Sequence, residues 1–191
     1  PVLQTVGYQE TLAAAMQTDH YKSTLEGPNR GRGVAAGFWF NGTGPACATA
    51  SVNGDGTVSL TEGSPDIGGG RASMAMQMAE VLGVPAEDVH PSVGDTDAVG
   101  YTSLTAGSGA IFKSGWASYE AAHDIKQQII ERAARIWEID VKDVEFKEGV
   151  ASHKSDPELK LNFKQIAARL NSTGGPIVGR GNVNPAGVGN A

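Results

Sequence analysis

The sequence contains two glycine-rich stretches that we expect to form turns, DIGGGRAS (residues 66–73) and YTSLTAGSG (residues 101–109). Each stretch stands directly before apolar residues with helical spacing. The start of a helix leaves about four backbone N–H groups without partners and carries a positive partial charge. Glycine has no Cβ, so such a backbone can approach an anion closely. Two such turns in one small domain predict a clamp for a phosphorylated or oxyanionic cofactor.

The candidate contacts with that cofactor are backbone amides, two hydroxyl groups and one cation. They belong to Gly68, Gly69, Gly70 and Arg71 in the first turn and to Thr105, Ala106, Gly107 and Ser108 in the second. A plainer interpretation remains open for each turn, namely a strand-to-helix turn that needs glycine for steric reasons and a Ser/Thr helix cap. The P-loop lysine and the dinucleotide-binding glycine spacing are both missing from the sequence.

Composition limits the class of protein. The chain has 191 residues, a net charge of −6 and 40% hydrophobic residues, which is typical of a globular domain. No run of like charges favours nucleic acid or a membrane surface as a partner, and no apolar stretch approaches the roughly 20 residues of a membrane span. Cys47 is the single cysteine, and the four histidines lack metal-ligand spacing, so we predict no metal site on side chains.

The periodicity predicts an α+β fold with a mixed or antiparallel sheet and helices packed mainly on one face. A tight turn at residues 53–56 joins two neighbouring strands as a hairpin, which disfavours a doubly wound parallel sheet. Helices are predicted over residues 8–22, from the first glycine turn to residue 82, over residues 110–138 and over residues 162–170. Gly83 should end the second of these helices, Asn162 should cap the last, and Met74, Met76 and Met78 are expected to lie in a core helix. Strands are predicted over residues 34–40, 46–52, 57–61, 89–93, 144–146 and 150–152, while residues 174–191 are expected to be mostly extended.

Five motifs together resemble the large subunit of molybdenum hydroxylases of the xanthine dehydrogenase and aldehyde oxidase type. They are VNGDGTV (52–58), residues 63–71, QMAEVLGVP (77–85), Asp95-Thr96 and TAGS (105–108). Their order and spacing agree over about residues 30–190, most strongly over 50–125.

The resemblance implies a molybdopterin cofactor, often in its cytosine dinucleotide form. Family members insert a water-derived oxygen into a C–H bond of an aldehyde or an N-heterocycle. Electrons then pass to iron–sulfur clusters and FAD on partner subunits or domains. The implied partners are the rest of the large subunit, those redox partners and a small-molecule substrate, with no nucleic acid and no membrane.

The sequence departs from the family pattern at three places. The family's Gly-Gln-Gly motif is here Gly68-Gly69-Gly70, so Gly69 has no side chain to reach the metal's apical oxo ligand. The family's general base, a glutamate in a Gly-Glu motif, is not matched by Gly189-Asn190, and the Phe-Arg-Gly motif would lie upstream of Pro1. We therefore predict no catalytic residue in this chain and no activity for it alone.

The resemblance also suggests a domain division. We expect residues 1–30 to form a helical arm and linker and residues 31–191 to form a partial molybdopterin-binding domain, cut from a longer polypeptide. Such a piece should expose apolar surface and self-associate. We expect a cytoplasmic location, with the periplasm as the alternative. Two other functions remain open at this point: a non-catalytic stand-alone α+β module, and an unrelated phosphate- or nucleotide-binding enzyme.

Overall fold

The structure, a computed structural model, describes residues 7–37 and 42–185. The chain divides into two units, residues 1–38 and residues 39–191. The first unit carries two helices, α1 (Tyr8–Met16) and α2 (Asp19–Lys22). The hydroxyl of Thr18 accepts a hydrogen bond from the amide of Tyr21 and starts α2 afresh. The single helix predicted over residues 8–22 is therefore wrong.

The second unit is built around a four-stranded mixed sheet. Its order is β3-β2-β1-β7, with β1 antiparallel to both neighbours and β2 parallel to β3. The strands are β1 (Ala46–Val52), β2 (Val58–Glu62), β3 (Val89–Val93) and β7 (Val178–Val183). The hairpin between β1 and β2 is confirmed, since the amide of Asn53 donates to the carbonyl of Thr57. The predicted strand over residues 34–40 is wrong for its described part, 34–37, and its remainder lies outside the described residues.

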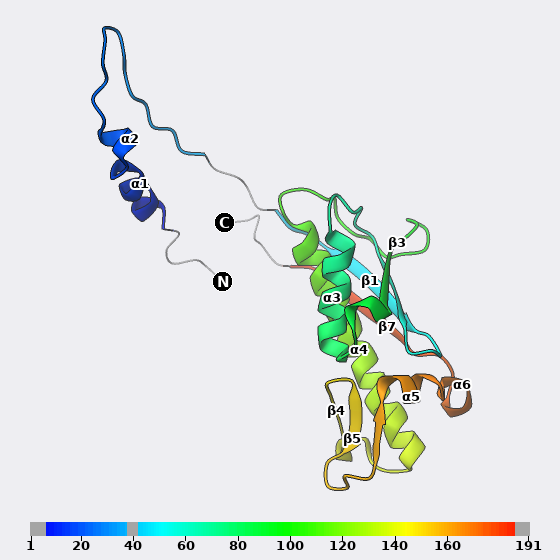
Figure 1. The fold of residues 1–191 in the computed structure, drawn as a ribbon. Helices are drawn as coiled ribbons and strands as arrows, with labels where there is room; N and C mark the ends of the chain where they lie inside the picture. Colours follow the sequence, from blue (N-terminus) through cyan, green and yellow to red (C-terminus); the bar gives the residue numbers. More distant parts are fainter. Residues whose placement is uncertain (1–6, 38–41, 186–191) are drawn as a thin grey trace. The chain divides into compact units, whose positions relative to one another are not determined.

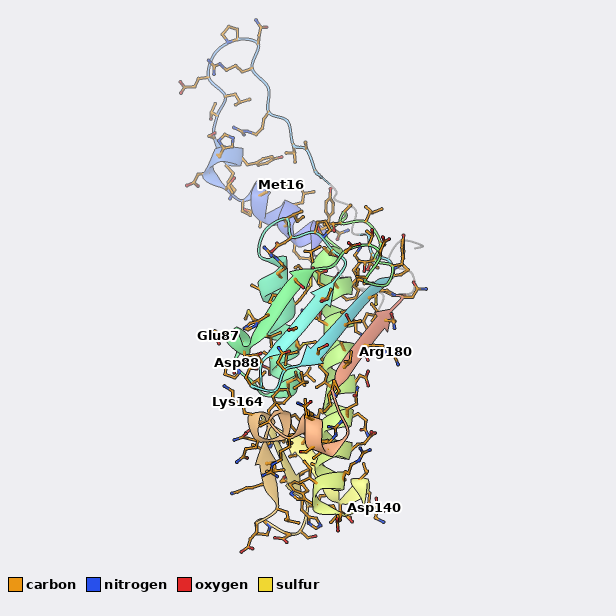
Figure 2. The ribbon with its side chains drawn as sticks, turned by 90° about the vertical axis from the view of Figure 1, so that its right-hand side faces the viewer. Met16, Glu87, Asp88, Asp140, Lys164 and Arg180 are labelled. Atoms are coloured by element: carbon orange, nitrogen blue, oxygen red, sulfur yellow. The ribbon has the colours of Figure 1, made fainter. Side chains whose placement is uncertain are left out.

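Two helices, α3 (Gly70–Leu82) and α4 (Ala110–Trp137), cover one face of this sheet (Figure 1). Met74, Met78, Ile125 and Ile129 are fully buried between these layers, whereas Met76, which we expected in the core, is 62% exposed. The opposite side of β7 is exposed, as its alternating burial and the position of Arg180 indicate (Figure 2). On β1, by contrast, the outward-facing Cys47 is buried close to Gly100. The predicted α+β fold with helices on one face is confirmed.

β7 was expected only as extended chain, and the structure shows why it forms a strand. Its inward positions are Gly179, Gly181 and Val183. A Cβ atom on Gly179 or Gly181 would overlap with the carbonyl oxygen of Ala121 or Ala117 on α4. The two glycines therefore let the backbone of β7 lie directly against the helix.

A smaller antiparallel sheet, of order β4-β5-β6, packs against the C-terminal half of α4 (Figure 1). Asn162 caps α5 through a reciprocal pair with Gln165, as expected, but the predicted helix over residues 162–170 is interrupted at Ala168. Lys164 of α5 lies 3.4 Å from Asp88, Nζ to Oδ2 (Figure 2). The elements of this part, with the short helix before β3, are η1 (Ala86–Asp88), η2 (Val141–Asp143), β4 (Val144–Lys147), β5 (Val150–His153), β6 (Lys160–Asn162), α5 (Phe163–Ala167) and α6 (Leu170–Thr173).

Candidate cofactor-binding site

The two glycine turns lie beside one another. The first joins β2 to α3, the second joins β3 to α4, and α3 and α4 pack together. A cavity of about 350 Å³ lies between the starts of the two helices and is called the junction cavity below. Its walls come from both turns and from the first residues of both helices: Pro65, Ile67, Gly68, Gly70, Met74, Thr105, Ala106, Ser108, Gly109, Ala110 and Ile111.

Five of the eight predicted contact residues line the junction cavity, namely Gly68, Gly70, Thr105, Ala106 and Ser108. Gly69 and Arg71 line a second cavity, of about 510 Å³, together with Asp66. Gly107 lines a third cavity, of about 280 Å³, together with Thr43. The structure therefore brings the two turns together but divides the predicted residues among three hollows.

The start of α3 is already occupied by a carboxylate from its own turn. Oδ1 of Asp66 accepts hydrogen bonds from the amides of Gly68 (2.9 Å) and Gly70 (3.0 Å), and Oδ2 lies 3.0 Å from Nε of Arg71. These bonds hold the pKa of Asp66 well below its usual range, because each of them favours the ionised form. Two of the amides predicted to face a ligand thus have an internal partner.

The start of α4 is open. Gly109 provides no side-chain cap, and the first turn of α4 contains no acidic residue. Among residues 42–185, no oxygen accepts a hydrogen bond from the amides of Ala110, Ile111 or Phe112. Unpaired amides at a helix start, with the positive end of the helix dipole, form an anion-binding arrangement.

The backbone before α4 is fixed in position by the segment that precedes β1. The amide of Gly42 donates to the carbonyl of Gly107 (2.8 Å), and a Cβ on Gly109 would overlap with the carbonyl oxygen of Gly42. Gly107 and Ser108 both adopt left-handed backbone angles, with φ of 60° and 59°. The second turn thus needs glycine both for its conformation and for close packing.

Two polar side chains near the junction cavity lack partners or counter-ions. Oγ1 of Thr105 is buried and has no hydrogen-bond partner among the described residues. Lys113, in the second turn of α4, is 1% exposed and forms no ion pair within the described part of the chain. Burial lowers the pKa of Lys113, because a low-dielectric surrounding disfavours the charged form.

A buried carboxyl group lies where the first turn leaves the sheet. Glu62, the last residue of β2, is fully buried. Its Oε2 accepts a hydrogen bond from the amide of Ser64 (2.6 Å), while Oε1 has no partner among the described residues. Burial raises the pKa of Glu62. The hydroxyl of Ser64 in turn lies 2.7 Å from that of Ser114, so a buried polar contact joins the segment before the first turn to α4.

Sequence reasoning missed Asp66, Lys113 and Glu62. Asp66 carried a usable signal, since an aspartate shortly before a glycine-rich helix start is a typical cap for the amides that follow. Lys113 and Glu62 carried none, because a charged residue in an amphipathic pattern is usually solvated. Their burial depends on how the loops pack over them.

Two searches of the described residues complete the description of the site. Residues 7–37 and 42–185 contain no group of three or more His, Cys, Asp or Glu side chains arranged to hold a metal ion. None of the helices in these ranges has the length and the hydropathy that a membrane span requires.

Known proteins are similar to this chain over most of its length. A family model described as the molybdopterin cofactor-binding domain matches residues 2–189. The chain is 30% identical over 121 residues to the nicotine 6-hydroxylase large subunit of Paenarthrobacter nicotinovorans, covering 63% of this chain and 15% of that protein. It is 34% identical over 159 residues to the probable hypoxanthine oxidase XdhD of Escherichia coli K12, covering 79% of this chain and 16% of that protein.

A solved structure shows the same fold. The CO dehydrogenase from Oligotropha carboxidovorans matches with a TM-score of 0.69 and 26% identity, over 78% of this chain and 18% of that chain. The chain thus spans less than a fifth of the length of each of these three proteins. Because the family model covers nearly all of its residues, the chain belongs to the molybdopterin cofactor-binding domains of the molybdenum hydroxylase family.

Proposed function

We propose that the chain forms one wall of the cofactor site of a molybdenum hydroxylase, with the junction cavity as the contact surface. The observation that carries this proposal is the meeting of both glycine turns in one cavity, in a chain of this family. Gly68, Gly70, Thr105, Ala106 and Ser108 are the proposed contacts. Gly69, Arg71 and Gly107 would support them from the neighbouring hollows.

The residues present fit an anionic group that accepts hydrogen bonds. The amides at the start of α4 and the buried hydroxyl of Thr105 are donors without an acceptor among the described residues. When bound, the molybdopterin supplies metal-centred oxidation chemistry. The chain's own residues would bind and orient it: the second turn through amides and hydroxyls, the first turn mainly through shape, since Asp66 already occupies two of its amides.

Gly69 fits its position for a conformational reason. It adopts a φ of 73°, a left-handed angle that favours glycine over glutamine. We propose that this chain orients the cofactor without the side chain that the family's usual glutamine would provide there.

The proposed reaction of the whole protein is the oxidation of an aldehyde or an N-heterocycle with oxygen derived from water. The names of two relatives, nicotine 6-hydroxylase and probable hypoxanthine oxidase, support a heterocyclic small-molecule substrate. We further propose a cytosine dinucleotide form of the cofactor, iron–sulfur and flavin partners, and no activity for this chain alone. A cytoplasmic location would suit the unpaired Cys47.

Copurified pterin tests the proposal. The 191-residue chain would be produced in a bacterium that makes molybdenum cofactor, purified and oxidised, and its pterin measured by fluorescence. Ala106→Leu narrows the junction cavity, whereas Ala98→Leu adds the same bulk at an exposed position outside it. We expect pterin with the wild type and with Ala98→Leu and a large loss with Ala106→Leu. A folded wild type without pterin, or equal pterin in all three, would contradict the proposal.

A further inference from the structure

Lys113 is tied to the second glycine turn by its ammonium group. Nζ donates hydrogen bonds to the carbonyl and the hydroxyl of Ser103 and to the carbonyl of Leu104, the last two at 2.7 Å. These residues directly precede Thr105 and Ala106, which line the junction cavity. The amide of Ser103 donates to the carbonyl of Pro45 (2.8 Å), so the loop is held between Lys113 and the start of β1.

All acceptors of Lys113 within residues 7–37 and 42–185 are neutral, although its charge is buried. Burying an ammonium without a carboxylate partner is costly. Lys113 also stands near the beginning of α4, where the helix dipole disfavours a cation. Arg132 provides a contrast: it is also buried and also donates to neutral oxygens, those of Leu170, Thr173 and Gly175, but it lies near the end of α4, where the dipole favours a cation.

Two positive features therefore coincide behind one turn: the open amides of α4 and the uncompensated charge of Lys113. Local rules that are broken together in a folded protein point to a functional site. An anion in the junction cavity would compensate both features at once. At the first turn the carboxylate of Asp66 already provides the negative charge at the helix start. Among the described residues, only the second turn therefore lacks an anionic partner.

We propose that Lys113 is the positioning residue of this site: it fixes the Ser103–Leu104 backbone and supplies the buried charge that favours a phosphate or pyrophosphate group at the start of α4. The inference rests on the proposed function, since it assigns the anionic part of the cofactor to this turn. Lys113 contacts the loop and acts through it.

Titration of the full chain with inorganic pyrophosphate tests this inference, with amide NMR shifts of residues 105–112 as the readout. We expect saturable shifts in the wild type that weaken as salt is added. Lys113→Met should bind roughly tenfold more weakly and with a smaller salt dependence, because one buried charge is lost. Lys113→Arg, which keeps the charge, should restore most of the affinity.

Two further variants keep the test decisive. Lys160→Met removes an exposed lysine with the same change in net charge, and it should bind as the wild type does. Lys113→Gln keeps a hydrogen-bond donor and drops the charge, so it replaces Lys113→Met should that variant fail to fold. Wild-type affinity and salt dependence in the neutral variants, or equal losses in Lys113→Arg, would overturn the role of Lys113.

The outcomes separate this inference from the proposed function. Equal pyrophosphate binding by the wild type and by Lys113→Gln would remove Lys113 from the site and leave the junction cavity as the cofactor contact. Copurified pterin without pyrophosphate binding at residues 105–112 would have the same meaning. If neither pterin nor pyrophosphate binds the folded wild type, both proposals fall.

Discussion

The carboxylate of Asp66 and the guanidinium of Arg71 lie 3.0 Å apart, Oδ2 to Nε, across the turn that begins α3. Through this pair and the amides of Gly68 and Gly70, the first turn satisfies its own helix start. The second turn, which is similarly rich in glycine, offers no carboxylate to α4. Two turns of related composition thus begin neighbouring helices, but the start of α3 has a carboxylate partner and the start of α4 has none among the described residues.

Asp66→Ala should destabilise the second unit, because the amides at the start of α3 lose their acceptor. We expect a melting temperature lower by about 2–4 °C near pH 7, the usual effect of losing a helix cap in a domain of this size. The pKa of Asp66 is lowered in the folded state, so its contribution is present above its unfolded value near 4 and lost as the pH falls through the folded value. The difference in melting temperature between Asp66→Ala and the wild type should therefore be constant from pH 7 to about pH 5 and begin to shrink only as the pH falls below about 4.

Asp97→Ala is the matched control, since Asp97 is exposed and its carboxylate accepts no hydrogen bond from the described residues. An Asp66→Ala variant that melts like Asp97→Ala at pH 7 would show that the carboxylate contributes nothing to the start of α3.

Glu62→Gln should be more stable than the wild type at pH 7. The pKa of Glu62 is raised in the folded state, mainly by burial, so the folded protein binds this proton more tightly than the unfolded chain does. Its contribution is fully present below the unfolded value near 4.3 and declines as the pH rises toward the folded value. The advantage of the neutral amide should appear in urea denaturation at pH 7 and shrink at pH 4. An exposed counterpart on α3, Glu80→Gln, should show neither effect; a pH-independent difference for Glu62→Gln would refute this explanation.

Gly181→Ala should destabilise the fold by about 1–3 kcal/mol, the usual cost of forcing an extra methyl into a packed interface. The new Cβ would overlap with the carbonyl oxygen of Ala117 and separate β7 from α4. Gly54→Ala places the same methyl group in open space in the β1–β2 turn and should change the free energy of unfolding by less than about 0.5 kcal/mol. Chemical denaturation measures both, and equal effects would argue against close packing of β7 on α4.

The chain should self-associate through a row of exposed aromatic residues on α4. Phe112, Trp116 and Tyr119 follow one another at helical spacing and are 53%, 41% and 44% exposed. We expect light scattering to detect oligomers that the double variant Phe112→Lys/Trp116→Lys disperses. Val141→Lys changes an apolar residue of similar exposure on η2 and should leave them intact. A wild type that stays monomeric at millimolar concentration would exclude this row as an interface.

Local signals predicted much of the fold. Gly83 ends α3 in the left-handed conformation expected of a C-terminal glycine, the Asn53–Gly56 turn forms the β1–β2 hairpin, and Asn162 with Gln165 caps α5. In each case the residues that decide the structure are neighbours in sequence. The meeting of the two glycine turns followed from the family resemblance and from the expectation that both begin helices of one domain.

What sequence reasoning missed depends on distant parts of the chain. β7 is a strand because it pairs with β1 and because Gly179 and Gly181 let it pack closely against α4. Both partners lie far away in the sequence. Lys113 is buried because the loop at residues 103–104 folds back over it, and no periodic pattern in the sequence predicts such a loop. The helix starts at the two turns differ because the side chain of Asp66 caps the first one. Which amides Asp66 accepts from depends on the backbone conformation of the turn, which the sequence pattern alone does not give.

The place of β7 in the sheet also affects the order in which the chain can fold. β1 is synthesised more than a hundred residues before the strand that covers its free edge, and it pairs with β7 from Ala46–Val183 to Ser51–Val178. Until the ribosome has delivered residue 183, that edge has no native partner, and the glycine-facing side of α4 stays uncovered. Long-range pairing of this kind slows folding and leaves an edge that can recruit foreign strands. Chains truncated before residue 178 should therefore depend on chaperones more than chains that extend past residue 183.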